Sequence, residues 1–167
     1  MPTTKNTLIQ GIGIAEVLPQ NPVYFTEIAI PETVTIPEEK PDMEMILSCM
    51  VEAVVISIRL IQTPCIKSYE GQLLSGRKLI IELKLDQKIT YVANVEDQSE
   101  HSAHFENLNN SVFVVVPQRI ANTPIEDFIK KGRFIVTPYI EDIYCEMLDS
   151  RTVFKNITLL LDVTFPV

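Results

Sequence analysis

The side chains of this chain that could do chemistry are few: two histidines, three cysteines and several adjacent acids. His101 and His104 stand three positions apart, a spacing that would place two imidazoles on one side of a helical turn and let them share a metal ion. A metal site needs about three or four ligands, however, and no cysteine or second histidine pair lies nearby in the sequence. We therefore expect no metal and no cofactor, with His101 and His104 as the candidates if an ion is bound.

Acid pairs and cysteines are the other candidates for catalysis. Glu38-Glu39 and Glu141-Asp142 could act as a general acid and base, but adjacent residues of a strand point to opposite faces and cannot flank one bond. Cys65 is the most loop-like cysteine, yet no activating base stands beside it. The chain contains no nucleophile elbow, phosphate loop or zinc-protease motif, and Gly11-Ile-Gly13 lacks the strand and third glycine of a dinucleotide site. We expect a protein that is not an enzyme, in which Gly11 and Gly13 mark flexible or close-packed backbone.

Two alternating segments form the centre of the chain. Apolar residues take every second position from Leu79 to Leu85, and after Asp86-Gln87 the alternation restarts from Ile89 to Val95. A period of two is typical of strands with one buried and one solvated face. The pattern predicts an antiparallel hairpin that turns at Asp86-Gln87.

Several further segments also favour strands. Residues 48–61 are apolar on nearly every position and rich in Val and Ile, which predicts a strand covered on both faces, after a short helical turn from Asp42 to Leu47. The polar segment 96–110 holds both histidines and is expected to make ordinary loop or sheet contacts before a short strand at 111–116. Residues 140–148 fit either helix or strand, and the turn signal at Asp149-Ser150, followed by alternation from 153 to 165, favours strand–turn–strand.

One helix has complete start and stop signals. Thr123 is placed to cap it, Pro124 takes the first helical position, and Gly132 follows the last turn. Acids lie in the first turn and lysines in the last, as the helix dipole favours. With many short strands separated by turn signals, the sequence predicts an all-β fold, a β-sandwich or a barrel-like domain, with one short α-helix near residues 124–131.

Composition limits the partners of the protein. The formal net charge of −8 and the lack of a basic patch argue against binding to nucleic acid. No run approaches the roughly 18 apolar residues of a membrane-spanning helix, so we expect no membrane insertion. The first residues contain no apolar core of signal-peptide length, so we expect synthesis in the cytoplasm. With 167 residues, the chain has the length of one domain.

Three cysteines, Cys49, Cys65 and Cys145, are too few and too scattered for a disulfide framework. They fit buried small hydrophobic residues. Their odd number also allows an intermolecular disulfide in an oxidising location, and the turn position of Cys65 makes it the candidate.

Four segments carry a resemblance to a known family. They are, in chain order, IPEEKPDMEMILS, SYEGQLLSGRKLIIELKLDQKITYVAN, QSEHSAHFENLNNSVFVVVP and YIEDIYCEMLDSRTVFKNITLLLDV, which together span residues 36–163. In this order they resemble the SPOCS domain of clostridial spore-envelope proteins. The resemblance implies a location in the spore envelope or on the spore or cell surface, and it assigns no chemistry to the HSAH motif. It divides the chain into an N-terminal arm with a Pro-rich connector at 1–35 and a SPOCS-like β domain at 36–167.

The arm is too apolar to be disordered in water without cost. Pro31, Pro37 and Pro41 would make the connector stiff, so the arm could reach the open strand edge of another copy and link copies head to tail. Pairing of the arm within its own chain, as ordinary first strands, is an equal alternative. The residues proposed for assembly are Leu8, Ile12, Ile14, Val23, Phe25 and Ile28.

Three hypotheses for function follow. The first is a structural protein of a spore envelope or surface appendage, whose copies assemble into a layer or filament through strand edges and the arm, with other spore-envelope proteins as further partners. The second is a binding module that recognises another coat protein or a glycan and does not polymerise. The third, a small-molecule-binding or enzymatic barrel, lacks visible convergent polar groups.

Overall fold

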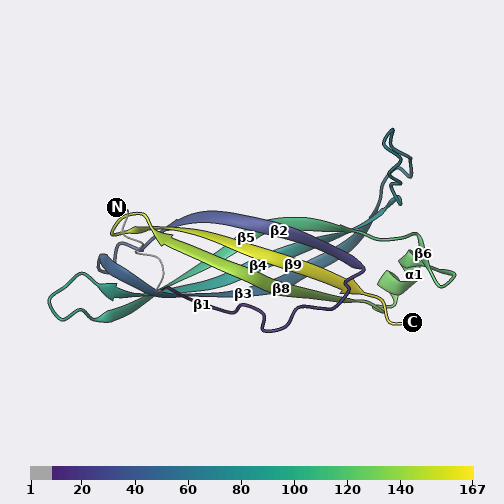
Figure 1. Ribbon diagram of the computed structural model, residues 1–167. Helices are drawn as coiled ribbons and strands as arrows, with labels where there is room; N and C mark the ends of the chain where they lie inside the picture. The colour runs from purple at the N-terminus through teal and green to yellow at the C-terminus, as the bar shows by residue number, and fades with distance from the viewer. Residues whose placement is uncertain (1–8) are drawn as a thin grey trace.

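The computed structural model describes residues 9–167, apart from the side chain at 109, and two β-sheets facing each other make up most of it (Figure 1). Leu8 lies outside the described residues. Sheet A has the strand order β1-β3-β4-β5, formed by β1 (Gln10–Ile12), β3 (Met43–Gln62), β4 (Arg77–Ala93) and β5 (Glu100–Val115). Sheet B has the order β2-β9-β8, formed by β2 (Tyr24–Thr35), β9 (Thr152–Thr164) and β8 (Ile135–Met147). The predicted all-β fold is confirmed, and the two-sheet arrangement is a sandwich.

The core lies between the two sheets. Odd-numbered residues of β4 and β9 point into it, and apolar side chains such as Leu83 and Leu159 are fully buried there. The even-numbered residues of β4 are mostly half-buried or exposed, which gives the alternation expected of a sheet with one wet face. The small pair β6 (Arg119–Ile120) and β7 (Thr123–Pro124) lies at one end with α1 (Ile125–Lys130), the predicted short helix.

The predicted hairpin with a turn at Asp86-Gln87 is wrong. Residues 77–93 form one continuous strand, and the turns of sheet A lie on either side of it. In both apolar runs on which the hairpin was based, the apolar residues stand at odd-numbered positions. One continuous strand can therefore point all of them into the core. Gln87 occupies the inward position between them and is only 3% exposed. A buried polar residue was therefore mistaken for a turn.

Two further boundaries differ from the prediction. Residues 43–47, expected in a helical turn, are the first residues of β3, because Met43 and Ile46 enter the core opposite β4. The polar segment around the histidines belongs to β5, which runs from Glu100 to Val115 in one strand. Every second residue of β5 points inward, and in this polar half Ala103 is fully buried.

The predicted strand–turn–strand at the C-terminus is confirmed. β8 and β9 pair antiparallel around residues 148–151, where Leu148 N–H donates to the Thr152 carbonyl at 2.9 Å. β8 begins at Ile135, five residues before the segment 140–148 that was expected to form this strand. A register shift between Ile140 and Asp142 bends this strand.

The N-terminal segment belongs to the sandwich, which corrects the division into an arm at 1–35 and a domain at 36–167. β2 pairs with β9 along its whole length, from Tyr24 opposite Val163 to Thr35 opposite Thr152. Ile30 and Val34 of β2 are buried in the core. Intrachain pairing, the alternative stated above, is the one that the structure has. Pro31 does not break β2, because an edge strand tolerates a residue without an N–H.

The connector between β2 and β3 is held by one arginine. Arg151, in the β8–β9 turn, donates to the carbonyl oxygens of Ile36 at 3.0 Å and Pro37 at 2.7 Å. Its Nη1 also forms an ion pair of 2.6 Å with Asp42. The Pro-rich connector is thus tied to the turn of sheet B and does not act as a free spacer.

The helix differs in its first residue and in its capping. Pro124 takes the cap position and no side chain caps the helix, so Thr123 does not act as predicted. The C-terminal end follows the expectation for glycine: Gly132 has φ +66°, its N–H donates to Ile129 and that of Arg133 donates to Phe128.

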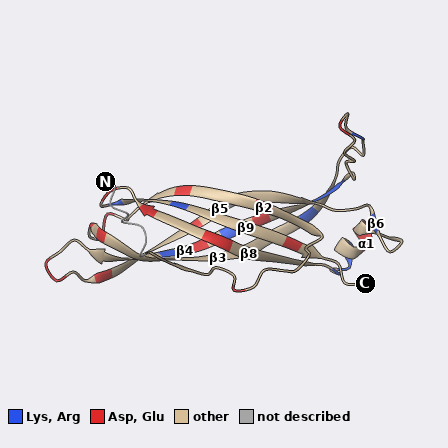
Figure 2. Cartoon of the chain, viewed as in Figure 1, with Lys and Arg blue, Asp and Glu red and all other residues tan. Residues whose placement is uncertain are grey.

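Figure 1 shows that the sandwich is elongated, with loops at both ends. The segment 63–76 between β3 and β4 projects away from the body at the end that carries α1 and the C-terminus. Acidic and basic residues are interspersed along the strands of both sheets (Figure 2). Among the described residues, no helix is long and apolar enough to span a membrane.

Candidate functional site

A lysine lies inside the sandwich. Lys155 of β9 is 0% exposed, and its side chain points between the sheets among apolar neighbours. Burying an ammonium group is costly unless it is paired and hydrogen-bonded. The residues around Lys155 therefore form the most unusual chemical environment in the described part of the chain.

Two side chains accept hydrogen bonds from the ammonium group of this lysine. Lys155 Nζ donates to Glu32 Oε2 of β2 at 3.2 Å and also to Gln87 Oε1 of β4. Gln87 Nε2 donates in turn to the same Glu32 Oε2 at 3.0 Å. One carboxylate oxygen therefore contacts both the lysine amine and the glutamine amide nitrogen. We call Glu32, Gln87 and Lys155 the polar triad.

Strand register explains why the triad meets. In sheet B, Lys155 lies directly between Glu32 and Cys145, its cross-strand partners on β2 and β8. In sheet A, Gln87 lies between Val51 and Phe105. Cross-strand partners point to the same face, so two rows of inward side chains meet across the core. The Phe105 ring centroid lies 5.6 Å from Lys155 Nζ, so an aromatic face covers the amine on one side.

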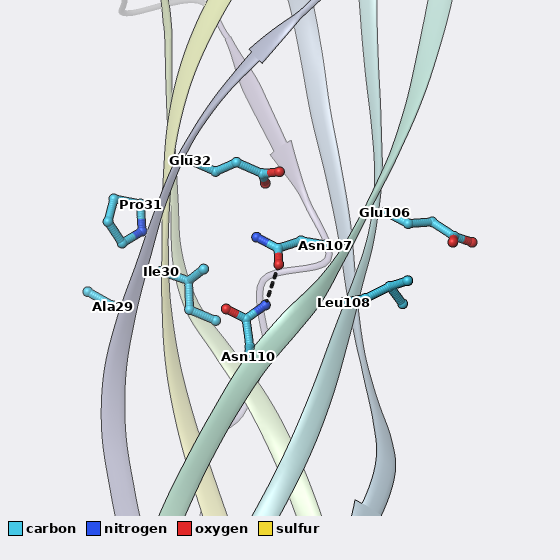
Figure 3. A pocket seen from close by; sticks show the side chains of 8 residues that line it. All are labelled: Ala29, Ile30, Pro31, Glu32, Glu106, Asn107, Leu108 and Asn110. Carbon is cyan, nitrogen blue, oxygen red and sulfur yellow. Dashed lines mark hydrogen bonds between the residues drawn. The ribbon is translucent and has the colours of Figure 1, made fainter.

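Glu32 connects this buried layer to the surface. Its side chain is 23% exposed and faces a cleft of about 400 Å³ between β2 and β5 (Figure 3). Asn107 and Asn110 line the cleft, and Asn110 Nδ2 donates to Asn107 Oδ1 at 2.8 Å. Figure 3 shows Asn107 directed toward Glu32, while Glu106 points away from it. The triad thus has a polar opening on the β2/β5 side of the sandwich.

Opposing effects act on the Glu32 carboxyl group. Burial raises its pKa, but the hydrogen bond from Gln87, the positive charge of Lys155 and the hydrogen bonds from Lys155 and Asn107 lower it. The net pKa lies below the ordinary value of 4.5, so Glu32 is a carboxylate in the resting protein. It pairs with the lysine as an ion pair within a mostly dry interior.

Two buried thiols lie beside the triad. Cys49 of β3 and Cys145 of β8 are both free, and their side chains are hydrogen-bonded across the two sheets. The hydrogen bond from Cys145 is the main cause that lowers the pKa of Cys49, whereas the same bond and burial raise the pKa of Cys145. Cys65 differs, since it is exposed in the 63–76 segment, where Gln118 Nε2 lies 3.3 Å from its sulfur.

The two candidate metal ligands are not brought together. Both lie on β5 three residues apart, and in a strand this spacing directs them to opposite faces. His101 stacks on Tyr91 with ring centroids 6.0 Å apart and lies 3.0 Å from Ser99 Oγ, while His104 is exposed. Among residues 9–167, no group of three or more His, Cys, Asp or Glu side chains could hold a metal ion.

The residues proposed for assembly have different positions. Ile12 lies in β1, which pairs with β3, and Phe25 and Ile28 lie in β2. Exposed side chains among them are Ile12, Ile14, Val23 and Phe25. Ile12 and Phe25 present an apolar surface although their strands pair within the chain, and Ile14 and Val23 lie just outside those strands.

Sequence reasoning missed the triad, although a signal for it was present. Gln87 and Lys155 both stand at inward parity in otherwise apolar alternations, Gln87 between Leu85 and Ile89, and Lys155 between Val153 and Ile157. A polar residue at such a position must find a partner inside the core. Glu32 carried no such signal, because its segment was interpreted as a connector.

No family model matches the chain, and neither a curated protein nor a solved structure matches it. The resemblance to the SPOCS domain therefore stays a prediction from the four segments quoted above.

Proposed function

We propose that this protein is a non-enzymatic structural subunit whose copies assemble through strand edges into a layer or filament of a spore envelope or surface appendage. The location follows from the resemblance to the SPOCS domain. The mode of assembly follows from the sandwich, and the observation that carries it is the edge strand β5.

β5 is a 16-residue strand at the end of sheet A, and no strand of the described chain pairs with its outer side. Its backbone N–H and C=O groups on that side can accept a strand of another copy. Natural edge strands usually carry features that prevent such pairing, and β5 has one of them, a register shift opposite Leu83–Leu85. It nevertheless exposes the apolar side chains of Leu108, Phe113 and Val115. A second copy of this chain is the occupant that an exposed apolar edge fits.

The N-terminal segment contributes apolar side chains to the same proposal. Val23 and Phe25 are exposed next to the start of β2, which is the edge of sheet B. Because β2 is already paired with β9, this segment contacts another copy through its side chains and does not exchange a strand.

Electron microscopy and sedimentation velocity of the purified protein over a range of concentrations test the assembly. We expect ordered polymers, and we expect Leu108→Lys to reduce them strongly, because a charge on the edge opposes strand pairing. Leu73→Lys is the matched control, since Leu73 is exposed in the 63–76 segment away from the β5 edge. A wild-type protein that stays monomeric at every concentration would refute the proposal.

The proposal includes a covalent link between two copies through Cys65. Its thiol is exposed, so two copies in an oxidising layer can form an intermolecular disulfide through it. Non-reducing electrophoresis of oxidised polymers should show a dimer band that Cys65→Ser abolishes. A dimer band that persists in Cys65→Ser would assign the link to another residue.

A different observation, the polar cleft, supports a second function. The polar cleft between β2 and β5, lined by Glu32, Glu106, Asn107 and Asn110, fits a binding module that recognises a glycan or a polar segment of another coat protein. Calorimetry against a panel of soluble glycans, with Asn110→Ala as the cleft variant, tests it. Binding by a monomeric protein that this variant weakens would favour this function over assembly.

A further inference from the structure

The polar triad has the parts of a bond-forming site. Lys155 supplies a primary amine, Gln87 supplies a carboxamide, and Glu32 Oε2 accepts hydrogen bonds from the nitrogen atoms of both. The Gln87 oxygen accepts a hydrogen bond from the lysine amine and its nitrogen donates one to the carboxylate, so the amide carbon lies one bond from the atom that contacts the nucleophile. An acyl transfer from nitrogen to nitrogen needs these three groups in this order.

We propose that Lys155 and Gln87 become joined by an intramolecular isopeptide bond after folding, with Glu32 as the general acid and base. The bond would link β9 of sheet B to β4 of sheet A through the middle of the core. This inference is independent of the proposed assembly, because it concerns one chain and one reaction without turnover.

The reaction balances without a co-reactant. A proton first moves from the Lys155 ammonium group to Glu32, which leaves a neutral amine and a neutral acid. The lone pair on Nζ then attacks Cδ of Gln87, and the Nζ–Cδ bond forms as the Cδ–Nε2 bond breaks. Glu32 donates its proton to the departing Nε2 and accepts one from Nζ, so ammonia leaves. Ammonia takes up the remaining proton as ammonium, and Glu32 returns to its carboxylate form.

The arrangement of the triad favours this reaction in two ways. The proton that must leave the amine has a short path to the base, since Lys155 Nζ donates directly to Glu32 Oε2 at 3.2 Å. Both reacting groups are also held in contact by their strands, since Gln87 and Lys155 are 3% and 0% exposed, and such positioning replaces a large entropic cost. Water is largely excluded from the amide, so hydrolysis does not compete.

Ammonia has a path out of the core. Glu32 lies between the buried amine and the cleft on the β2/β5 side, and this cleft is lined by polar groups that can hydrogen-bond to ammonia (Figure 3). Asn107 is the other carboxamide that contacts Glu32, which makes it the alternative acyl donor to be excluded.

Intact mass spectrometry of the full-length, denatured and reduced protein tests the proposal. We expect nearly all molecules to be lighter than the sequence mass by one ammonia molecule. Trypsin should yield a branched product in which residues 85–88 are joined to residues 152–167, because an acylated Lys155 is not cleaved. Wild-type protein that unfolds cooperatively but has the full sequence mass would overturn the proposal.

Variants assign the roles of the triad. Glu32→Gln should have the full mass, since it keeps the shape of the side chain but cannot transfer the protons. Glu106→Gln is the matched control on the same cleft and should keep the cross-link. A branched product at Asn107 would exclude Gln87 as the acyl donor, and a link from Gln87 to Cys49 that hydroxylamine cleaves would exclude Lys155 as the nucleophile. Because the mass and the tryptic branch point are both measured on the wild-type protein, failure of a variant to fold leaves the test intact.

Discussion

Two carboxyl groups of sheet B have pKa values shifted in opposite directions. In the triad, Glu32 has partners and its pKa is lowered overall. On the other face of β9, Asp162 is buried, and its Oδ1 has no hydrogen-bond partner within residues 9–167. Burial accordingly raises the pKa of Asp162 above its ordinary value of 3.8. The surroundings of Glu32 stabilise its anion, whereas ionised Asp162 lowers the free energy of unfolding.

Replacing Asp162 should therefore stabilise the fold at neutral pH. A carboxyl group whose pKa is higher in the folded than in the unfolded state contributes stability at low pH and loses it as pH rises through the folded pKa. We expect Asp162→Asn to raise the midpoint of urea unfolding at pH 7, with the gain disappearing near pH 3.8 and below.

Asp149→Asn is the matched control with the opposite sign. Asp149 Oδ1 accepts a hydrogen bond of 2.8 Å from the backbone N–H of Arg151, and this bond lowers the pKa of Asp149. Its variant should be less stable than the wild type at pH 7, and the difference should shrink in acid. Equal effects of the two substitutions would contradict the assignment.

The residues of the triad show what sequence could and could not supply at this scale. The inward positions of Gln87 and Lys155 follow from alternation alone, so the existence of polar residues in the core was predictable. Their meeting depends on which strands face each other across the core, and alternation does not specify this. Glu32 could be placed only once β2 was known to pair with β9.

At the scale of elements, the N-terminal glycines give a prediction. The close-packed backbone that was one interpretation of Gly11 and Gly13 is confirmed: Gly13 has φ +114°, and a Cβ placed on it would lie 2.1 Å from the Val51 carbonyl oxygen. The adjoining residues close the side of the sandwich between β3 and β8, where Ala15 N–H donates to the Ile140 carbonyl at 2.8 Å.

Gly13→Ala should therefore destabilise the protein by several times more than Gly71→Ala. Both glycines have positive φ, so each substitution adds strain of about 1 kcal/mol. Gly71 has open space around it, whereas Gly13 would also have to move away from β3. Urea denaturation of both variants measures the difference. Similar losses would mean that residues 10–15 contribute little to the stability of the sandwich.

Strand identities were easier to predict than strand lengths. The alternation of β4, the β-branched run of β3 and the turn before β9 all come from local sequence, and the structure has them. Where one strand ends was misjudged at Gln87 and at the polar half of β5, because a turn and a partly polar strand have similar composition. Tertiary contacts decide between these two, as the Lys155–Gln87 hydrogen bond does for β4.

At the scale of the whole molecule, the position of β2 decides how copies can interact. Sheet B has three strands, with β9 between β2 and β8, so removal of β2 would leave β9 as an unpaired edge. It would also expose the side of the core that Ile30 and Val34 now cover. A chain that donates β2 to a neighbour would lose this cover unless another copy supplied its own β2 in return.

Deletion of residues 1–30 tests this directly. We expect the truncated chain to lose cooperative unfolding and near-native circular dichroism, because most of β2 and its pairing with β9 are gone. Deletion of residues 1–9 is the matched control, since it keeps every strand from Gln10 onward, and it should unfold cooperatively. A folded, monomeric protein after deletion of residues 1–30 would show that β2 is dispensable to its own sandwich and free to link copies. Loss of folding would show that the sandwich requires the pairing of β2 with β9.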